Sequence, residues 1–351
     1  MKQILGTSPL VQAARLLTAW YAENRTPLPW RELRSPYRTW ISEIMLQQTR
    51  TAAVIPYFER FMKAFPDVKA LADADEDALL KLWEGLGYYS RARNLHRAAK
   101  EIVSRFGGEL PRTAKELRSL PGIGDYTAGA IASICFGEPE PAVDGNVLRV
   151  VARLCASETD IALPDTKRAV TKALRAVYPT DGSAGLLTEG LMELGERVCI
   201  PNGEPKCLSC PLAEICLGLG AGKQSDLPVK SPKKARKIRP CTVLLLRCDN
   251  RYAIEKRPAK GLLAGLWEFP NVDGYLSAGE ALAYAQSLGA RPTGVTSAGD
   301  ATHVFTHIEW HMRGYFVECE AMPAALIWAT PAEIADTYTV PKAFRAYLNQ
   351  I

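Results

Sequence analysis

The hydrophobic pattern of this 351-residue chain changes near residue 220, and this change is the strongest constraint on its fold. Before that point, apolar residues recur at helical spacing in segments at about 8–21, 35–45, 51–65, 75–86, 90–105, 113–119, 125–136, 145–155, 166–178 and 184–198. After it, CTVLLLRC (241–248), RYAIEKR (251–257) and residues 301–319 are typical of strands, and 277–288 of a helix. The sequence predicts an all-α region (1–220) and a separate α+β domain (241–351).

A basic segment joins the two regions. Residues 221–240 carry seven Lys or Arg, one Asp and two internal prolines, a composition that predicts a solvated interdomain linker. Since the whole chain has a net charge of +5 and this segment contributes +6, the remaining residues sum to −1. A simple spacer and a phosphate contact explain the segment equally well, so charge alone does not identify a nucleic-acid partner.

Composition predicts a globular protein inside the cell. Apolar residues make up 47% and charged residues 23%, and no run approaches the roughly 18 apolar residues of a membrane helix. The apolar N-terminal stretch is interrupted by Gln12 and Arg15, which argues against a secretory signal. We therefore expect a cytoplasmic protein, associated with the nucleoid if it is bacterial, with no membrane partner. The sequence does not reveal the oligomeric state, and a monomer is the working expectation.

Four of the nine cysteines form a group with informative spacing. Cys199, Cys207, Cys210 and Cys216 lie within 18 residues, whereas the other five are scattered among apolar neighbours as buried thiols are. Structural zinc usually takes two close pairs of ligands, and only Cys207 and Cys210 form one. The spacing favours a four-iron four-sulfur (4Fe–4S) cluster over zinc, which stays open as the alternative.

The pentapeptide from Leu120 to Gly124 (LPGIG) lies between two helical patterns. Gly122 and Gly124 let the backbone approach a ligand closely, and the N-terminus of the following helix attracts phosphate. This arrangement predicts a helix-hairpin-helix grip on one DNA strand without sequence readout. An ordinary turn between two helices is the alternative.

Two carboxylates are unremarkable when each is taken alone. Asp144, in VDGNV, precedes a helical pattern and has the position of an ordinary N-cap. Glu43 flanks an apolar helix stripe beside Trp40 and Gln47, where a solvated carboxylate would be common. Only their combination with other motifs suggests chemistry.

The combination resembles the helix-hairpin-helix DNA glycosylase superfamily with an iron–sulfur cluster, and within it most closely the MutY family of adenine glycosylases. The resemblance spans nearly the whole chain and rests on LPWR (28–31), WISEIMLQQT (40–49), EGLGYYSRARNL (84–95), LPGIGDYTAGA (120–130), VDGNVLRV (143–150) and the four cysteines. It implies a helical catalytic region with a six-helix barrel, ending in a cluster loop at 199–216. The second and third motifs are the most specific.

The resemblance also implies roles for individual residues. Glu43 matches the general acid/base, Asp144 the carboxylate that stabilises the sugar cation, and Asn146 its hydrogen-bonding neighbour. Tyr126 stands where related bifunctional lyases carry a nucleophilic lysine. Residues implied to contact the extruded adenine are Trp30, Arg31 and Glu189, and those around the opposing base are Gln48, Thr49, Leu86 and Tyr88.

The C-terminal region resembles the Nudix-like (pyrophosphohydrolase-like) domain that this family appends. GLLAGLWEFP (261–270) carries the likeness, but the glutamates with which an active hydrolase binds magnesium are absent after Pro270. The resemblance implies a domain that has lost hydrolase activity and recognises 8-oxoguanine through HVFTHIEWH (303–311), with Thr306 and His307 facing the lesion. On strand alternation we expect Val304 and Thr306 on one face and Phe305 and His307 on the other.

Two departures from the family pattern stand out. Seven residues separate Cys199 from Cys207, one more than is usual, which predicts a bulge near Gly203. Thr306 replaces the usual serine, keeping the hydroxyl and adding a methyl group.

The resulting hypothesis is an adenine DNA glycosylase of base excision repair. It would hydrolyse the N-glycosidic bond of adenine mispaired with 8-oxoguanine or guanine in double-stranded DNA, with Glu43 as general acid/base and Asp144 stabilising the oxocarbenium ion. The alternatives are an endonuclease-III-like glycosylase/lyase, a nucleotide pyrophosphohydrolase acting through the C-terminal domain, and a non-catalytic iron–sulfur DNA-binding protein.

Overall fold

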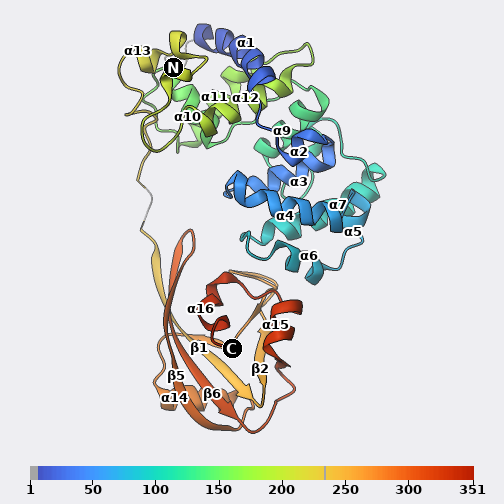
Figure 1. Cartoon of the computed structure of the whole chain (residues 1–351), viewed down its shortest axis with the longest axis vertical. Coiled ribbons are helices and arrows are strands. Elements are labelled where there is room, and N and C mark those ends of the chain that lie inside the picture. Colours follow the sequence, from blue (N-terminus) through green and yellow to red (C-terminus); the bar gives the residue numbers. More distant parts are fainter. Residues whose placement is uncertain (1–6, 233–234) are drawn as a thin grey trace. The chain divides into compact units, whose positions relative to one another are not determined.

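The computed structural model describes residues 7–232 and 235–351. Residues 1–6, at the start of the stretch tested as a secretory signal, and Lys233 and Lys234 of the basic segment lie outside the described residues. The chain divides into two compact units, Met1–Ala74 with Arg93–Pro232 and Asp75–Ala92 with Lys233–Ile351 (Figure 1). Each unit is described by itself.

The region from residue 7 to residue 220 is helical, as the periodicity predicts. The helices of this region are α1 (Thr7–Asn24), α2 (Pro29–Glu32), α3 (Pro36–Leu46), α4 (Thr51–Ala64), α5 (Val68–Ala72), α6 (Glu76–Trp83), α7 (Ser90–Phe106), α8 (Ala114–Leu117), α9 (Asp125–Phe136), α10 (Gly145–Leu154), α11 (Pro164–Arg175), α12 (Ala184–Arg197) and α13 (Leu217–Gly220), with 3₁₀ turns η1 (Cys207–Ser209) and η2 (Ala213–Ile215). Sequence periodicity missed α2, α5 and α13 because helices this short do not complete two turns of a pattern.

Local capping explains where the main helices begin. The Ser35 hydroxyl accepts from the Arg38 amide and Pro36 occupies the first turn of α3, while Asp75 and Asp144 cap α6 and α10 in the same way. Residues of α1, α10, α11 and α12 then share one apolar core, which includes the fully buried Leu17 and Val151. This core holds the start of α10 and the middle of α12 in place, and both contribute to the site described below. Among the described residues, no helix is both long and apolar enough to cross a membrane.

The C-terminal region is a mixed sheet with a few helices, confirming the predicted α+β class. Its strands are β1 (Lys237–Cys248), β2 (Arg251–Lys256), β3 (Trp267–Glu268), β4 (Asn271–Asp273), β5 (Pro292–Val304), β6 (Ile308–Cys319) and β7 (Ile327–Ala329). The order is β3-β2-β1-β6-β5, with β4 on β1 and β7 on β2. The β1–β6 pair is parallel, with Cys241 opposite Met312, and the other pairs are antiparallel.

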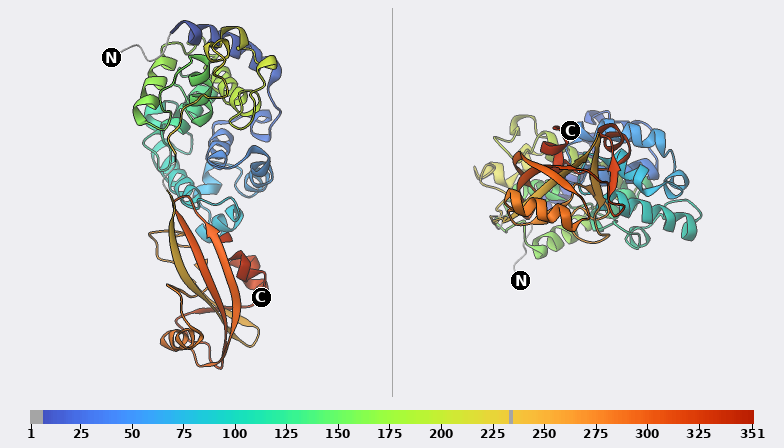
Figure 2. Two further views of the ribbon diagram at one scale, coloured as in Figure 1. Left: turned by 90° about the vertical axis from the view of Figure 1, so that its left-hand side faces the viewer. Right: turned by 90° about the horizontal axis from the view of Figure 1, so that it is seen from below.

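Both faces of this sheet are covered, which accounts for the continuous apolar run in β1. Val243 and Leu245 point into one core, with Phe344 and Tyr347 from η3 (Lys342–Phe344) and α16 (Arg345–Leu348). Leu244 and Leu246 point into a second core under α14 (Ala278–Ser287), the helix predicted at 277–288. The remaining helix, α15 (Pro331–Thr337), follows β7. The long strands β1, β6 and β5 lie side by side in Figure 2.

The basic segment is less of a solvated linker than its composition predicts. Leu227 is buried, the Arg153 guanidinium donates to its carbonyl, and Ile161 donates its amide to the carbonyl of Val229. At the other end, β1 begins at Lys237, four residues before the predicted strand. The composition of this segment gives no sign that Leu227 is buried or that β1 begins at Lys237, because the partners of both come from other parts of the folded chain.

Candidate active site

A pocket of about 210 Å³ in the first unit brings together eight of the residues singled out from the sequence. Its walls include Trp30, Arg31, Glu43, Thr49, Tyr126, Asp144, Asn146 and Glu189. They come from α2, α3, α9, α12 and the start of α10, with Thr49 between α3 and α4, so segments more than 150 residues apart converge. The other lining residues, which the sequence did not single out as site residues, are Leu28, Arg34, Thr39, Ser42, Leu46, Arg50, Thr51, Ile134, Met192 and Glu196.

Glu43 is a buried carboxyl group, not a solvated one at the edge of a helix. Its side chain lies on α3 at 6% exposure, and Oε2 is buried without a hydrogen-bond partner. Burial raises the pKa of Glu43 to about 7, and the charges of Glu189 and Asp144 act in the same direction. A hydrogen bond from Tyr126 and the charge of Arg31 act against this shift of the pKa. Near neutral pH this group therefore exchanges a proton readily.

Asp144 is both the N-cap of α10 and a wall of the pocket. Its Oδ1 accepts from the Val147 amide at 2.8 Å and its Oδ2 from Asn146 Nδ2 at 2.9 Å. Burial raises the pKa of Asp144, and these hydrogen bonds oppose the rise. The cap geometry fixes the direction of this carboxylate, whereas one oxygen of Glu43 has no such restraint.

Arg149 connects this end of α10 to the cysteine loop. Its Nη2 donates to Asn146 Oδ1 at 2.9 Å and to the Gly195 carbonyl, and its Nε donates to the Cys199 carbonyl at 2.7 Å. Because Asn146 in turn donates to Asp144, hydrogen bonds through two side chains link the Cys199 carbonyl to the pocket.

Tyr126 lies on α9 between Glu43 and Met192. Its hydroxyl is hydrogen-bonded to the Glu43 carboxyl group and lies 3.7 Å from Met192 Sδ. Burial, reinforced by the charges of Glu43 and Asp144, raises the pKa of Tyr126 well above its ordinary value. The phenol therefore stays protonated and acts as a hydrogen-bond donor.

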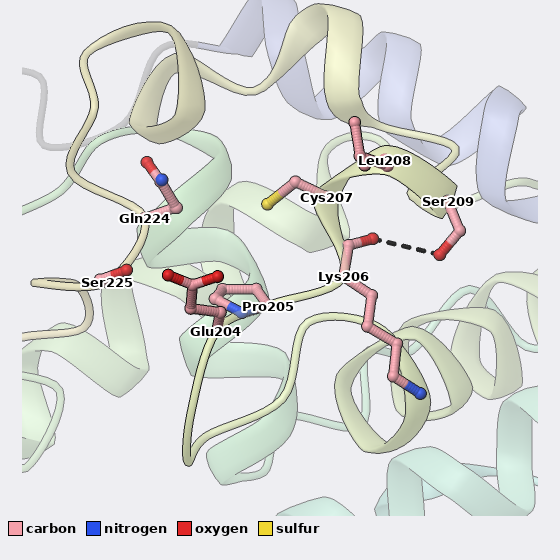
Figure 3. Close-up of a pocket in the computed structure, with 8 residues that line it drawn as sticks. All are labelled: Glu204, Pro205, Lys206, Cys207, Leu208, Ser209, Gln224 and Ser225. Atoms are coloured by element: carbon pink, nitrogen blue, oxygen red, sulfur yellow. Dashed lines mark hydrogen bonds between the residues drawn. The ribbon is translucent and has the colours of Figure 1, made fainter.

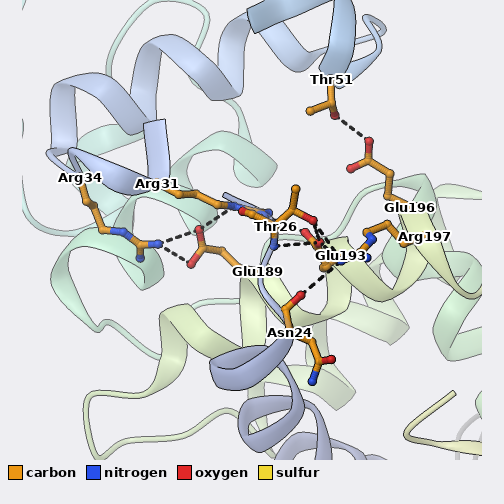
Figure 4. A network of polar contacts seen from close by, with 9 residues as sticks. All are labelled: Asn24, Thr26, Arg31, Arg34, Thr51, Glu189, Glu193, Glu196 and Arg197. Atoms are coloured by element: carbon orange, nitrogen blue, oxygen red, sulfur yellow. Dashed lines mark hydrogen bonds and ion pairs between the residues drawn. The ribbon is translucent and has the colours of Figure 1, made fainter. Parts of the chain in front are cut away.

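Alternating charges extend from the pocket wall, where Arg34, Glu189 and Arg31 lie, to two residues that do not line the pocket, Glu193 and Arg197 (Figure 4). Arg34 Nη2 donates to both oxygens of Glu189, at 2.9 and 2.7 Å, and Arg31 Nε lies 3.5 Å from Glu189 Oε1. Arg31 Nη1 also donates to Glu193, one helical turn after Glu189 on α12, and Arg197 reaches the same carboxylate. The sequence offered two signals for this network: glutamates four residues apart on one helix, and arginines three apart near Trp30.

The predicted helix-hairpin-helix turn joins α8 to α9, and Gly122 and Gly124 are both exposed. Gly122 has φ +77°, and a Cβ there would lie 2.6 Å from Asn94 Cβ, so only glycine fits. Gly124 is the N-cap of α9 and faces open space. The first glycine is required by the turn itself, while the second leaves room for a ligand to approach the helix N-terminus.

Two of the residues expected around the opposing base have unusual backbone conformations. Gln48 and Tyr88 are left-handed at φ 59° and 48°, which is uncommon outside glycine and often marks functional positions. Tyr88 is 44% exposed, whereas the Leu86 side chain is buried at 8%. Neither Gln48, Leu86 nor Tyr88 lines the 210 Å³ pocket.

Thr306 and His307 occupy the two central positions of the β5–β6 hairpin turn. The Phe305 amide donates to the Ile308 carbonyl at 2.8 Å and closes this turn. Thr306 and His307 are both exposed, so the expected alternation stops at Phe305, and His307 does not follow that residue into the core. Within the second unit, the Tyr88 and Thr306 hydroxyls lie 2.9 Å apart.

The four grouped cysteines line one small cavity of about 30 Å³, together with Arg153. Arg153 Nη1 donates to Cys199 Sγ at 3.3 Å, and Cys216 Sγ donates to the Arg153 carbonyl. Figure 3 shows an adjoining pocket, in which the Cys207 thiol points toward the side where Gln224 lies. Gly203, where a bulge was predicted, has φ +77°. Thiols are the usual ligands of an iron–sulfur cluster. Within residues 7–232 and 235–351, however, no three His, Cys, Asp or Glu side chains are close enough together to hold a metal ion as they stand.

Comparisons with known proteins identify the family of the chain. Residues 41–179 match the family model of HhH-GPD superfamily base excision DNA repair proteins, and residues 241–350 match that of the NUDIX domain. The chain is 33% identical to the adenine DNA glycosylase of Rattus norvegicus, over 95% of this chain and 77% of that protein. The chain belongs to the adenine DNA glycosylase family.

Other members of the family span bacteria and animals. The adenine DNA glycosylase of Homo sapiens is 33% identical over 95% of this chain and 73% of its own length. That of Buchnera aphidicola subsp. Baizongia pistaciae is 33% identical over 85% of this chain and 84% of its own. Among solved structures, a thermostable thymine-DNA glycosylase has a TM-score of 0.54 and 24% identity, covering 61% of this chain and 98% of its own. That likeness supports the fold of the helical part.

Proposed function

We propose that this protein hydrolyses the N-glycosidic bond of adenine mispaired with 8-oxoguanine or guanine in duplex DNA, leaving an abasic site. The observation that carries the proposal is the placement of Glu43 and Asp144 in one pocket with different restraints. One carboxyl group has a pKa of about 7 and a free oxygen, and the other is held as a helix cap by two hydrogen bonds. Sites that cleave glycosidic bonds use two carboxyl groups in different roles.

Glu43 is proposed as the general acid. Adenine leaves readily only after a ring nitrogen is protonated, which requires a group that still carries a proton near neutral pH. Burial provides such a group by raising the pKa of Glu43. The hydrogen bond between Tyr126 and Glu43 opposes this rise of the pKa.

Asp144 is proposed to stabilise the oxocarbenium ion left on the sugar. A fixed carboxylate is worth more there than a mobile one, because its orientation costs nothing as the charge develops. Asn146, held by Arg149, maintains that orientation. Trp30, Arg31 and Glu189 would surround the extruded adenine.

The remaining predicted residues are assigned to DNA. The exposed turn at Gly122 and Gly124 suits a phosphate, and Tyr88, Gln48, Thr49 and Leu86 would fill and read the vacated position. Thr306 and His307 would read 8-oxoguanine from residues 241–351, while residues 1–220 perform the chemistry. The protein would act as a monomer. It would be located in the cytoplasm, associated with the nucleoid if it is bacterial.

A 4Fe–4S cluster is proposed as the cofactor, held by Cys199, Cys207, Cys210 and Cys216. Their shared cavity and the Arg153 donor support it, and the cluster would order the loop after α12. The purified protein should be brown and contain about four irons per chain. Cys207→Ala should lose iron and DNA affinity together, and finding about one zinc and no iron would contradict the assignment.

The function is tested with labelled duplexes carrying 8-oxoguanine·A, G·A or T·A, followed by quantification of abasic sites. We expect release from the first two and little from the third. Glu43→Gln should keep mismatch binding and lose excision by at least about 10²–10⁴-fold, the usual value of a general acid. Excision near the wild-type rate in this variant would remove Glu43 from the mechanism.

The alternatives give different outcomes in the same set of assays. A glycosylase/lyase would be trapped strongly by borohydride, which we do not expect because Tyr126 cannot form a Schiff base. A pyrophosphohydrolase would release phosphate from nucleotides with magnesium. We expect no such release, since the acidic Glu268 is already paired with Arg257.

A further inference from the structure

Glu193 accepts hydrogen bonds from three residues, yet it does not line the pocket. Its side chain is 2% exposed. Oε2 accepts from Arg31 Nη1 at 2.8 Å, while Oε1 accepts from Arg197 Nη1 at 2.9 Å, from the Thr26 amide at 3.3 Å and from the Thr26 hydroxyl. Figure 4 shows these donors converging on it from three segments of the chain.

These bonds fix one edge of the Arg31 guanidinium. The same Nη1 also donates to the Thr26 carbonyl at 3.1 Å, and the guanidinium lies over the Tyr21 ring, 5.4 Å from its centroid. With this edge held, Nε remains directed toward Glu189 Oε1 at 3.5 Å. A planar group with one edge and one face restrained has little freedom to turn.

Glu193 also sets the charge balance behind the pocket. The sequence of contacts Arg34–Glu189–Arg31–Glu193–Arg197 holds three cations and two anions. Removing the charge of Glu193 would leave Arg31 with Glu189 alone, which Arg34 already shares. Such a change is felt strongly because Arg31, Glu189 and Glu193 are largely removed from water.

We propose that Glu193 is a positioning residue: it holds Arg31 in the adenine-facing orientation and cancels enough of the Arg31 charge for Glu43 to keep its proton. This inference rests on the proposed function and extends it to a residue that touches no substrate. A merely structural carboxylate would stabilise the fold without influencing the proton on Glu43.

The pH dependence of excision distinguishes these two roles. The groups that face Glu43 are Tyr126 and Cys135 from α9, Glu189 from α12, Asp144 at the start of α10 and Arg31 from α2. Among them the charge of Arg31 lowers the pKa of Glu43. If Glu193 is neutral, more of that charge acts on Glu43, which then loses its proton at a lower pH.

Two variants should therefore shift the alkaline limb of the single-turnover rate in opposite directions. Glu193→Gln should move it to lower pH by roughly half a unit or more, and raise the enzyme concentration for half-maximal rate about tenfold. In Arg197→Met, Glu193 stays charged and no longer pairs with Arg197, so it neutralises more of the Arg31 charge. Glu43 should then keep its proton to a higher pH, and the alkaline limb should move to higher pH. If Glu193→Gln does not fold, Arg197→Met decides alone, and an unmoved limb contradicts the proposal.

A second readout does not depend on catalysis. Hydrogen exchange of the Thr26 amide should accelerate in Glu193→Gln, because that amide loses its acceptor. Glu268→Gln is the matched control, since it removes a buried carboxylate paired with an arginine in the other unit. It should lower the melting temperature and leave the pH limb on G·A duplexes and the Thr26 exchange unchanged.

The results separate failure of the two proposals. Two outcomes would show a purely structural role for Glu193. One is that the alkaline limb of the pH–rate profile shifts equally in both variants. The other is that Glu193→Gln lowers the melting temperature but leaves this limb and the exchange of the Thr26 amide as in the wild type. If the wild-type protein releases no adenine, the proposed function fails, while unchanged Thr26 exchange would independently show that Glu193 does not hold this segment.

Discussion

At the scale of single residues, burial and the lack of a cationic partner decide which carboxyl group can transfer a proton near neutral pH. Glu43 sits on a helix whose pattern would equally suit a solvated side chain, but α9, α10 and α12 close over it and leave one oxygen without a partner. Glu189 and Glu193 are as buried, yet both are neutralised by arginines. A buried carboxyl group without a cationic partner is the costly one.

This cost predicts that the fold is less stable at alkaline pH because of Glu43. Its pKa is about 7 in the folded chain and about 4.5 in the unfolded chain, so the folded state binds more protons between these values. Stability from this group is full below about pH 4.5 and declines as pH rises to about 7. Glu43→Gln should then be more stable than wild type at pH 8, by up to about 3 kcal/mol, and nearly equal at pH 4.5.

Urea unfolding of both proteins at these two pH values measures the difference. A Glu43→Gln variant that is equally destabilised at both would mean that Glu43 is ionised at little cost in the folded protein. The same substitution is expected to abolish excision, so activity and stability would change in opposite directions.

At the scale of elements, the hairpin between α8 and α9 contains two glycines, Gly122 and Gly124, of which one is needed for folding and the other for the proposed DNA contact. Gly122 is held against Asn94 in a left-handed conformation, and Gly124 faces open space. The two glycines look equivalent in LPGIG, but only the first is required by the turn.

Alanine substitutions should therefore act differently at the two positions. Gly122→Ala should destabilise the fold by at least about 1–2 kcal/mol, because it combines strain with a clash. Gly124→Ala should fold normally and weaken duplex binding, since a methyl group would lie at the helix N-terminus where a phosphate is expected. Thermal unfolding and binding at fixed salt test the pair, and normal DNA affinity in folded Gly124→Ala would contradict a phosphate contact there.

At the scale of the whole molecule, residues far apart in sequence act in one unit. The segment Asp75–Ala92 groups with the C-terminal domain, where Lys81 donates to the Tyr338 carbonyl and Lys256 pairs with Asp77. The Tyr88 and Thr306 hydroxyls meet in this unit, 218 residues apart. Tyr88, which we propose fills the vacated position in the duplex, and Thr306, which we propose reads 8-oxoguanine, are thus joined by a hydrogen bond.

Because the two hydroxyls share this bond, their effects on lesion preference should not add. Tyr88→Phe and Thr306→Val are each expected to lower the preference for 8-oxoguanine·A over G·A several-fold, and the double variant little further. The affinity ratio for the two duplexes at one salt concentration is the measurement. Fully additive losses would mean that the two hydroxyls contribute separately.

The sequence alone determined the longer elements and named the candidate site residues. Helical and strand periodicities located the longer helices and β1, β2 and β6, because a two- or 3.6-residue repeat survives in any single chain. The candidate acid, cap, hairpin and cysteines could be named because their residue types stand in a recognisable order. Short elements such as α2 and β7, and the packing of Leu227, leave no comparable signal.

Only the tertiary structure decided which of these groups meet and what each meeting does to its protonation. The burial of Glu43, the hydrogen bond from Arg31 to Glu193 and the link from Cys199 through Arg149 to Asp144 all depend on contacts between segments remote in sequence. Side-chain electrostatics depends on solvent exclusion and on neighbours within a few ångströms, and neither quantity is encoded in local pattern.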